Sequence, residues 1–175
     1  MLAVVVLAAV AACVALPMIW RTEHQARVSA CAANLSALYR AQQEYGARFG
    51  QWDAPARPET GRAFWMALGR TSPPIIAPGD QHIWYCPVRD HFDRSTDYRG
   101  PVLPQRAWMS AWRVDNETGV GNQVTPARVN EVVAADREGN HGWGRGGNVL
   151  RLYGDVQTVG EEDPLWREAA VTTKH

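Results

Sequence analysis

An uncharged, apolar segment at the beginning of the chain constrains the fold more than any other feature. The segment Leu2–Trp20 (LAVVVLAAVAACVALPMIW) has 19 residues and no charged side chain, and Arg21 ends it. A helix needs roughly 20 apolar residues to cross about 30 Å of hydrocarbon. The length and composition of this segment therefore predict a membrane-spanning helix rather than part of a small soluble core.

Two other interpretations of the segment compete with a retained span. A cleaved secretory signal would carry positive charge ahead of its apolar stretch, and only Met1 precedes this one. A lipoprotein signal is suggested by Val10–Cys13 (VAAC), but the residues after Cys13 stay apolar up to Trp20. Pro17 does not oppose a span, because prolines near the ends of membrane helices are tolerated. A retained span is the prediction we keep.

The residues after the apolar segment predict that the same helix continues to about Gly50. Apolar side chains recur there in steps of three and four, which places them on one stripe of a helix. The stripe consists of Val28, Cys31, Leu35, Leu38, Tyr45 and Phe49, with Gln42 filling a gap. We expect the stripe to pack on a globular head. A coiled-coil dimer is the alternative, although two heptads rich in Ala and Gln support it poorly.

After Gly50 the pattern changes to one typical of a small α+β head. A short helix is expected over Arg62–Gly69, and the prolines within Thr71–Asp80 exclude regular structure there. The predicted strands are His82–Cys86, Ala107–Val114, Val129–Ala135, Asn148–Tyr153 and Asp155–Val159. The last two flank a two-residue turn at Tyr153–Gly154, where glycine can take a positive φ.

A long helix followed by antiparallel strands gives an α+β fold class. We divide the chain into a membrane part (1–20), an exposed continuation of the helix (21–50) and a globular head (51–175). The tail after Glu161 is expected to fray, with docking of Leu165 and Trp166 on the sheet as the alternative.

Charge and candidate ligand residues give little support for nucleic acid or metal as a partner. Lys+Arg and Asp+Glu each number 18, so no net basic charge favours nucleic acid. The carboxylates of Asp90, Asp93 and Asp97 crowd one loop and are weak calcium candidates, but their spacing lacks the order of an EF-hand. A solvated acidic loop is the preferred interpretation. Likewise, His82, Cys86 and His91 do not have zinc-site spacing.

Catalysis is not expected, and neither is a cofactor. A triad of Asp136, His141 and Ser110 can be drawn, but the chain has no nucleophile elbow around that serine. Seven tryptophans lie beyond the apolar segment; core packing is the preferred interpretation, and a sugar-binding or partner-binding surface is the alternative. With Cys13 in the apolar segment, Cys31 and Cys86 remain as a possible disulfide pair in an exported domain.

Several segments taken in order resemble the type IV pilin-like family, and type II secretion pseudopilins in particular. The N-terminal helix is similar at Leu16–Arg21 (LPMIWR) and Cys31–Leu35 (CAANL). Farther on, Cys86–Pro87 and Asp97–Pro101 (DYRGP) resemble a Cys-Pro pair and a Tyr-Arg-Gly segment of one branch of that family. The residues that resemble the branch's H-X9-DG segment are Asp136, His141, Gly147, Asn148 and Gly154.

The chain departs from the family at two places. The prepilin leader and the glutamate at the fifth mature position are absent, since alignment on Pro17 puts that glutamate just before Met1. We expect the true start to lie upstream; loss of the processing site is the alternative. In the H-X9-DG segment, two extra residues intervene, and Tyr153 stands where aspartate is usual, with Asp155 as its candidate replacement.

The resemblance implies a non-enzymatic, single-pass subunit of the bacterial cytoplasmic membrane with its head on the outer side. Its partners would be the membrane, like subunits and a secretion apparatus. Pro17 would let the helix bend during assembly, and small residues such as Ala8 and Ala12 would let neighbouring helices approach closely. The alternative functions are a solitary anchored module that binds a carbohydrate or protein of the envelope and, less favoured, an anchored hydrolase.

Overall fold

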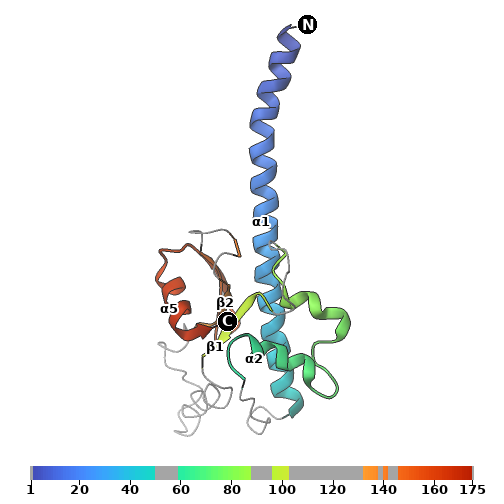
Figure 1. Cartoon of the computed structure of the whole chain (residues 1–175), viewed down its shortest axis with the longest axis vertical. Coiled ribbons are helices and arrows are strands. Elements are labelled where there is room, and N and C mark those ends of the chain that lie inside the picture. The colour runs from blue at the N-terminus through green and yellow to red at the C-terminus, as the bar shows by residue number, and fades with distance from the viewer. Residues whose placement is uncertain are drawn as a thin grey trace.

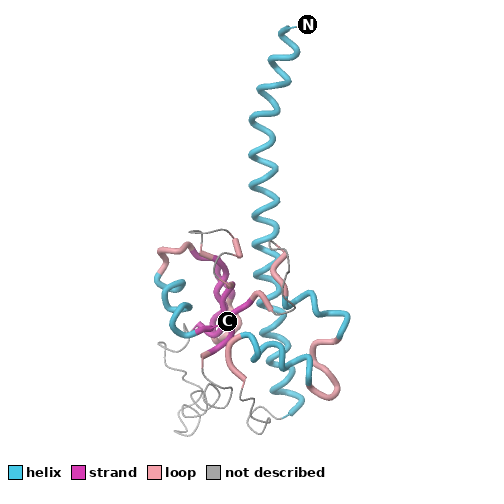
Figure 2. The backbone as a smooth tube through the Cα atoms, viewed as in Figure 1, coloured by secondary structure: helices cyan, strands magenta, loops and turns pink. Residues whose placement is uncertain are grey.

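The computed structural model describes residues 2–49, 59–87, 96–102, 132–137, 140–141 and 146–174. Its dominant element is the helix α1 (Leu2–Phe49), which runs through Pro17 without a break and carries the head at one end (Figures 1 and 2). The predicted long helix is therefore confirmed. A search of the described residues finds no helix that is both long and apolar enough to cross a membrane.

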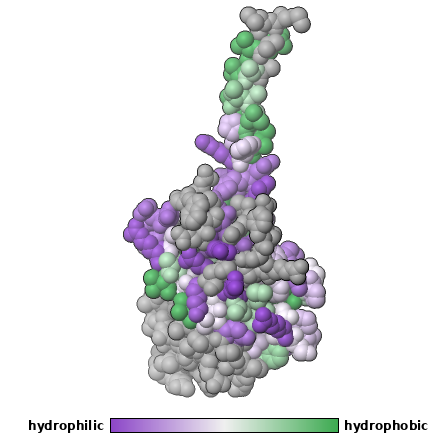
Figure 3. Space-filling model, in the orientation of Figure 1, coloured by the Kyte–Doolittle hydropathy of each residue, from purple (hydrophilic) through white to green (hydrophobic). Residues whose placement is uncertain are grey.

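The two halves of α1 have different surroundings. We call residues 2–20 the stalk and residues 28–49 the packed half. Every side chain described between residues 4 and 23 is exposed, and hydrophobic residues gather along the stalk (Figure 3). In the packed half, the predicted stripe meets the head: Cys31, Leu35 and Leu38 are completely buried, and Gln42 and Tyr45 nearly so. The periodicity therefore identified the packing face correctly.

The head contains a five-stranded antiparallel sheet in the order β4-β3-β2-β1-β5 among the described residues. Its strands are β1 (Tyr98–Pro101), β2 (Val132–Asp136), β3 (Gly147–Arg151), β4 (Val156–Val159) and β5 (Thr173–Lys174). Three of them match predicted strands, and the fold class α+β is confirmed. The predicted strand Ala107–Val114 lies outside the described residues.

The sheet separates two apolar clusters, with α1 on one face and α5 (Pro164–Thr172) on the other (Figure 1). Side chains of a strand alternate between faces. Accordingly, Leu150 packs in the cluster with α1, whereas Val149 packs with Trp166 of α5. A register irregularity between Val132 and Ala134 inserts Val133 as an extra residue, so that Val133 and Ala134 both join the α1 cluster.

Several predictions about local structure are wrong. A 3₁₀ helix, Pro78–Trp84, covers most of the segment predicted as a strand at His82–Cys86, and it also covers residues 78–80, where regular structure was excluded. A proline at its first turn starts the helical conformation. The tail does not fray after Glu161 but forms α5. The Asp163 carboxylate caps this helix by accepting a hydrogen bond from the Leu165 amide at 2.8 Å. The alternative expectation, docking of Trp166, is confirmed.

The predicted helix at Arg62–Gly69 is present as α2 (Arg62–Met66), continued by the 3₁₀ helix η1 (Ala67–Arg70). A turn joins β3 to β4 as predicted, but it is longer than the predicted two residues, because β3 ends at Arg151 and β4 begins at Val156. There Gly154 has φ +88°, and a Cβ atom at this position would overlap the ring of Tyr39 on α1. The turn therefore requires glycine both for its backbone conformation and for its contact with the packed half.

Candidate functional site

The candidate site begins at the last residue of β2, Asp136, which is completely buried. Its Oδ2 atom accepts two hydrogen bonds, one from the backbone amide of Asn148 at 2.7 Å and one from His141 Nε2 at 2.5 Å. An ionised carboxylate only accepts, so the histidine proton in this contact resides on Nε2. Asp136 thus links the end of β2 to β3 and orients the imidazole of His141.

The side chain of Asn148 continues this network across the sheet to α1. Its amide group donates to the carbonyl of Val28 at 3.1 Å, and its Oδ1 accepts from Thr158 Oγ1 at 2.6 Å. Asn148 is completely buried, and a buried amide without such partners would be costly. The network ties two strands to the place where the packed half of α1 begins.

The disulfide Cys31–Cys86 lies beside this network, and the pairing considered from the sequence is confirmed. The ligand atoms of Cys31, Cys86 and His141 lie within 4.8 Å of one another. Because the two sulfurs are bonded to each other, neither is available as a thiolate ligand for a metal. A bridge of this kind is typical of proteins of oxidising compartments.

The third calcium candidate, Asp97, has a role in the head's own packing. It is buried, and its Oδ2 accepts from the Cys86 amide at 2.9 Å. Its backbone carbonyl accepts from the Arg137 amide and from Asn140 Nδ2. Asp97 therefore joins the disulfide to the turn that carries His141. The other two candidates, Asp90 and Asp93, lie outside the described residues, so the calcium prediction stays untested.

Burial strongly shifts the pKa of one side chain in this region, that of Tyr98. Its hydroxyl lies 3.3 Å from the Tyr85 carbonyl, and its ring is completely buried. Burial raises the pKa of Tyr98 far above its ordinary range, and the nearby charge of Asp136 raises it further. Tyr98 is therefore a neutral hydrogen-bond donor at the centre of the head.

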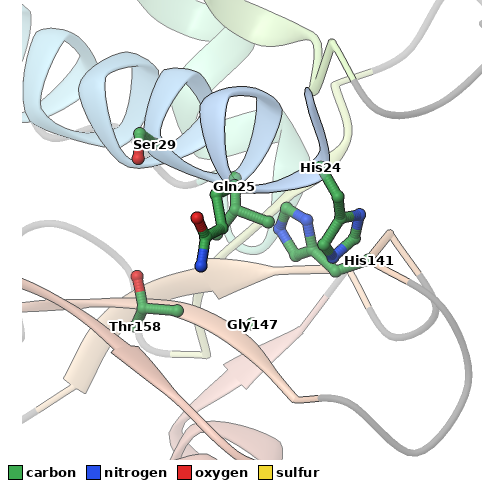
Figure 4. Close-up of a pocket in the computed structure, with 7 residues that line it drawn as sticks. His24, Gln25, Ser29, His141, Gly147 and Thr158 are labelled. Atoms are coloured by element: carbon green, nitrogen blue, oxygen red, sulfur yellow. The ribbon is translucent and has the colours of Figure 1, made fainter. Parts of the chain in front are cut away.

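A pocket of about 620 Å³ lies between the start of the packed half and the sheet (Figure 4). We call it the collar pocket. It is lined by His24, Gln25, Val28 and Ser29 of α1 and by His141, Gly147 and Thr158. The rings of His24 and His141 meet edge to face at one end, with centroids 6.3 Å apart. His24 could not be identified from the sequence, because a single histidine on a helix carries no motif.

Of the residues taken from the H-X9-DG resemblance, the structure brings four together and separates one. Asp136, His141, Gly147 and Asn148 surround the collar pocket or the network behind it, whereas Gly154 lies at the far end of β3 against α1.

Pro17 and Ala12 are exposed on the stalk, and the side chain of Ala8 is outside the described residues. The Ser110 of the rejected triad is also outside them.

The tryptophans of the head that the structure describes are core residues. Trp65, Trp84 and Trp166 are at most 8% exposed. They follow the packing interpretation and offer no support for a tryptophan-lined binding surface. Comparison of the chain with family models, curated proteins and solved structures finds no match.

Proposed function

We propose that this protein is a membrane-anchored, non-enzymatic subunit of the pilin and pseudopilin kind, which assembles with like subunits in a type II secretion or type IV pilus apparatus. The proposal rests on one observation. A single unbroken helix has one apolar half whose described side chains are exposed and another half that packs against the head. The exposed apolar residues, 51 to 76% accessible, are Val4, Val6, Leu7, Val10, Val14, Leu16, Met18, Ile19 and Trp20.

Burial of the apolar surface of the stalk, in lipid or against another protein, is energetically favourable. Removing one large apolar side chain from water gains about 1.5–3 kcal/mol, so nine exposed ones favour insertion into lipid or packing against neighbours. A bilayer would surround the stalk with lipid, and the stalks of adjacent subunits would pack against it. Exposed small residues such as Ala12 suit close approach between helices.

The disulfide supports an orientation with the head outside the cytoplasm. Structural disulfides persist in oxidising compartments and are rare where thiols are kept reduced. A head that contains Cys31–Cys86 at its core therefore belongs on the outer side of the bacterial cytoplasmic membrane, with the stalk in the bilayer. The sequence resemblance points the same way.

Cys13 offers a direct test of assembly because it is a free, exposed cysteine on the stalk. In native membranes, oxidation should crosslink Cys13 of one copy to Cys13 of another, and the Cys13→Ser variant should give no crosslink. Diluting purified protein with excess lipid distinguishes assembly from random collision. Crosslinking that disappears in proportion to dilution would contradict assembly and favour a solitary anchor.

Two further measurements separate anchoring from assembly. Extraction at alkaline pH should leave the protein in the membrane, and its release would contradict anchoring. Intact mass and terminal sequencing of the native protein should reveal an N-methylated first residue, as expected of a processed pilin. We expect Pro17→Ala to keep membrane insertion but to reduce filament incorporation.

The collar pocket favours a second candidate function, a solitary anchored module that binds a small polar ligand of the envelope. Imidazole, amide and hydroxyl groups line the pocket together with the apolar side chain of Val28, and convergent polar groups of this kind are typical of ligand sites. This candidate predicts no crosslinks between stalks. Binding of an envelope carbohydrate that is lost when Thr158 or Gln25 is enlarged would support it.

A further inference from the structure

We infer that His24 and His141 form a binding site for a divalent transition metal at one end of the collar pocket. The inference is independent of assembly, because it concerns only side chains where α1 meets the sheet. Imidazole nitrogens suit Zn²⁺, Cu²⁺ and Ni²⁺ better than they suit calcium or magnesium. The site would use two histidines from distant parts of the chain, with water completing the coordination.

His141 has the environment of an oriented metal ligand. Its Nε2 is engaged with the Asp136 carboxylate, and its other ring nitrogen, Nδ1, is buried without a hydrogen-bond partner among the described residues. Metal-bound histidines almost always donate their second N–H to a carboxylate or carbonyl, which fixes the tautomer and the ring. With the proton on Nε2, the lone pair of Nδ1 is available to a cation.

The charge of the site favours a cation as well. Asp136 is completely buried, and within the described part of the chain the basic side chain in contact with its carboxylate is the imidazole of His141. The second oxygen of the same carboxylate, Oδ1, has no hydrogen-bond partner among those residues. A buried carboxylate is costly unless a positive charge compensates it. A metal ion on Nδ1 would supply that charge through the imidazole.

His24 lies within reach of the same ion. A metal about 2.0–2.1 Å from one nitrogen of each ring would sit roughly 3.2 Å from both ring centroids, so it can bridge centroids up to about 6.4 Å apart. The observed centroid distance is 6.3 Å. Tetrahedral coordination would bring the rings about 1 Å closer. Metal binding would therefore draw the half-buried His24 side chain toward His141.

The test is a Zn²⁺ titration of the full chain in detergent micelles, with Cys13→Ser in every protein so that no free thiol competes. Competition with a chromophoric zinc indicator gives stoichiometry and affinity, and Co²⁺ gives a visible absorption band for nitrogen coordination. His82→Ala is the matched control, because His82 lies against a different part of α1. His24→Ala is the decisive variant, since its side chain lies at the surface.

We expect one Zn²⁺ per chain, at least tenfold weaker binding in His24→Ala, and unchanged binding in His82→Ala. Asp136→Asn should weaken binding about 10–100-fold, since it removes the partner that orients His141. If His141→Ala or Asp136→Asn does not fold, His24→Ala alone decides. Absence of stoichiometric Zn²⁺ binding would overturn the inference. Equal affinity of His24→Ala and the parent would overturn it as well, because other histidines would then hold the metal.

Discussion

The stalk and the packed half of α1 share one helix but differ in everything that surrounds it. Leu7 in the stalk is 76% exposed, whereas Leu35 in the packed half is completely buried. The backbone geometry is continuous between them, so secondary structure does not distinguish the two regions. The difference teaches that helical conformation alone does not set the role of a side chain. The surrounding structure decides whether a leucine of α1 stabilises the head or stays exposed.

Packing also decides where stability resides. An isolated helix in water is marginal, and most helical stability in proteins comes from burying one face. The packed half buries its stripe and is joined to the head by the disulfide, the Asn148 side chain and the turn at Gly154. Among the described residues, the stalk has no comparable contact with the head. Mutations in the packed half should therefore lower the stability of the head, and mutations in the stalk should not.

The largest expected effect comes from removing the covalent link between the packed half and the head. Cys31 and Cys86 are 55 residues apart, and closing a loop of this size stabilises a fold by about 4 kcal/mol. Replacing both by alanine should lower the free energy of unfolding by about that amount. Denaturant unfolding in detergent followed by tryptophan fluorescence measures it. Cys13→Ser is the control, and equal midpoints for the two variants would contradict the prediction.

A matched pair of leucines tests the comparison itself. Leu35→Ala should destabilise the head by about 3 kcal/mol, because it opens a cavity in the core. Leu7→Ala should leave head stability unchanged within about 0.5 kcal/mol, since no side chain of the head covers it. Chemical denaturation of both variants measures the difference. Similar losses would break the division of α1 into two regions.

The β3–β4 turn supplies a third test on the packed half. Gly154→Ala should destabilise the head by about 2 kcal/mol, because alanine is strained at φ +88° and its methyl group would displace Tyr39. Gly160→Ala is the matched control, because nothing lies within 4 Å of a Cβ atom there. Thermal unfolding curves should show the first variant lowered and the second close to the parent. Equal shifts would mean that the Tyr39 contact is unimportant.

The smallest effect is expected on the outward face of the packed half. Glu44 and Arg48 form an ion pair at 2.6 Å with partly exposed side chains. Exposed pairs of this kind contribute about 0.3–0.5 kcal/mol in a helix. Glu44→Ala should therefore change the unfolding free energy by no more than about 0.5 kcal/mol, and added salt should reduce the difference. A loss of several kcal/mol would show that burial is a poor guide to energy in this half.

Several elements of the head were predictable, and the reasons for the others are physical. The β3–β4 hairpin has alternating residues and a turn glycine, and both signals are local. The cap at Asp163 followed by Pro164 is also a local helix signal, so α5 could have been found. In contrast, β5 is two residues long and exists because Lys174 pairs with Gly100. Pairing across 74 residues leaves no trace in a sequence window.

The candidate site was predictable only in its parts. The resemblance named Asp136, His141 and Asn148, but their order along the chain does not say which atoms meet. The carboxylate accepts from a backbone amide, a contact that depends on the register between β2 and β3. His24 joined the site because α1 crosses the sheet at that level. Its pairing with His141 depends on how the helix docks, which its neighbours in sequence do not encode.

Sequence by itself determined the long helix, the stripe that packs, and the extent of the apolar run. Each of these depends on periodicity or composition, which act on neighbouring residues. Tertiary structure alone decided the pairing of Cys31 with Cys86 and the 3.1 Å hydrogen bond from Asn148 to Val28, between residues 120 positions apart. Such contacts form only when the whole core has packed, because burial, rather than local propensity, brings their atoms together.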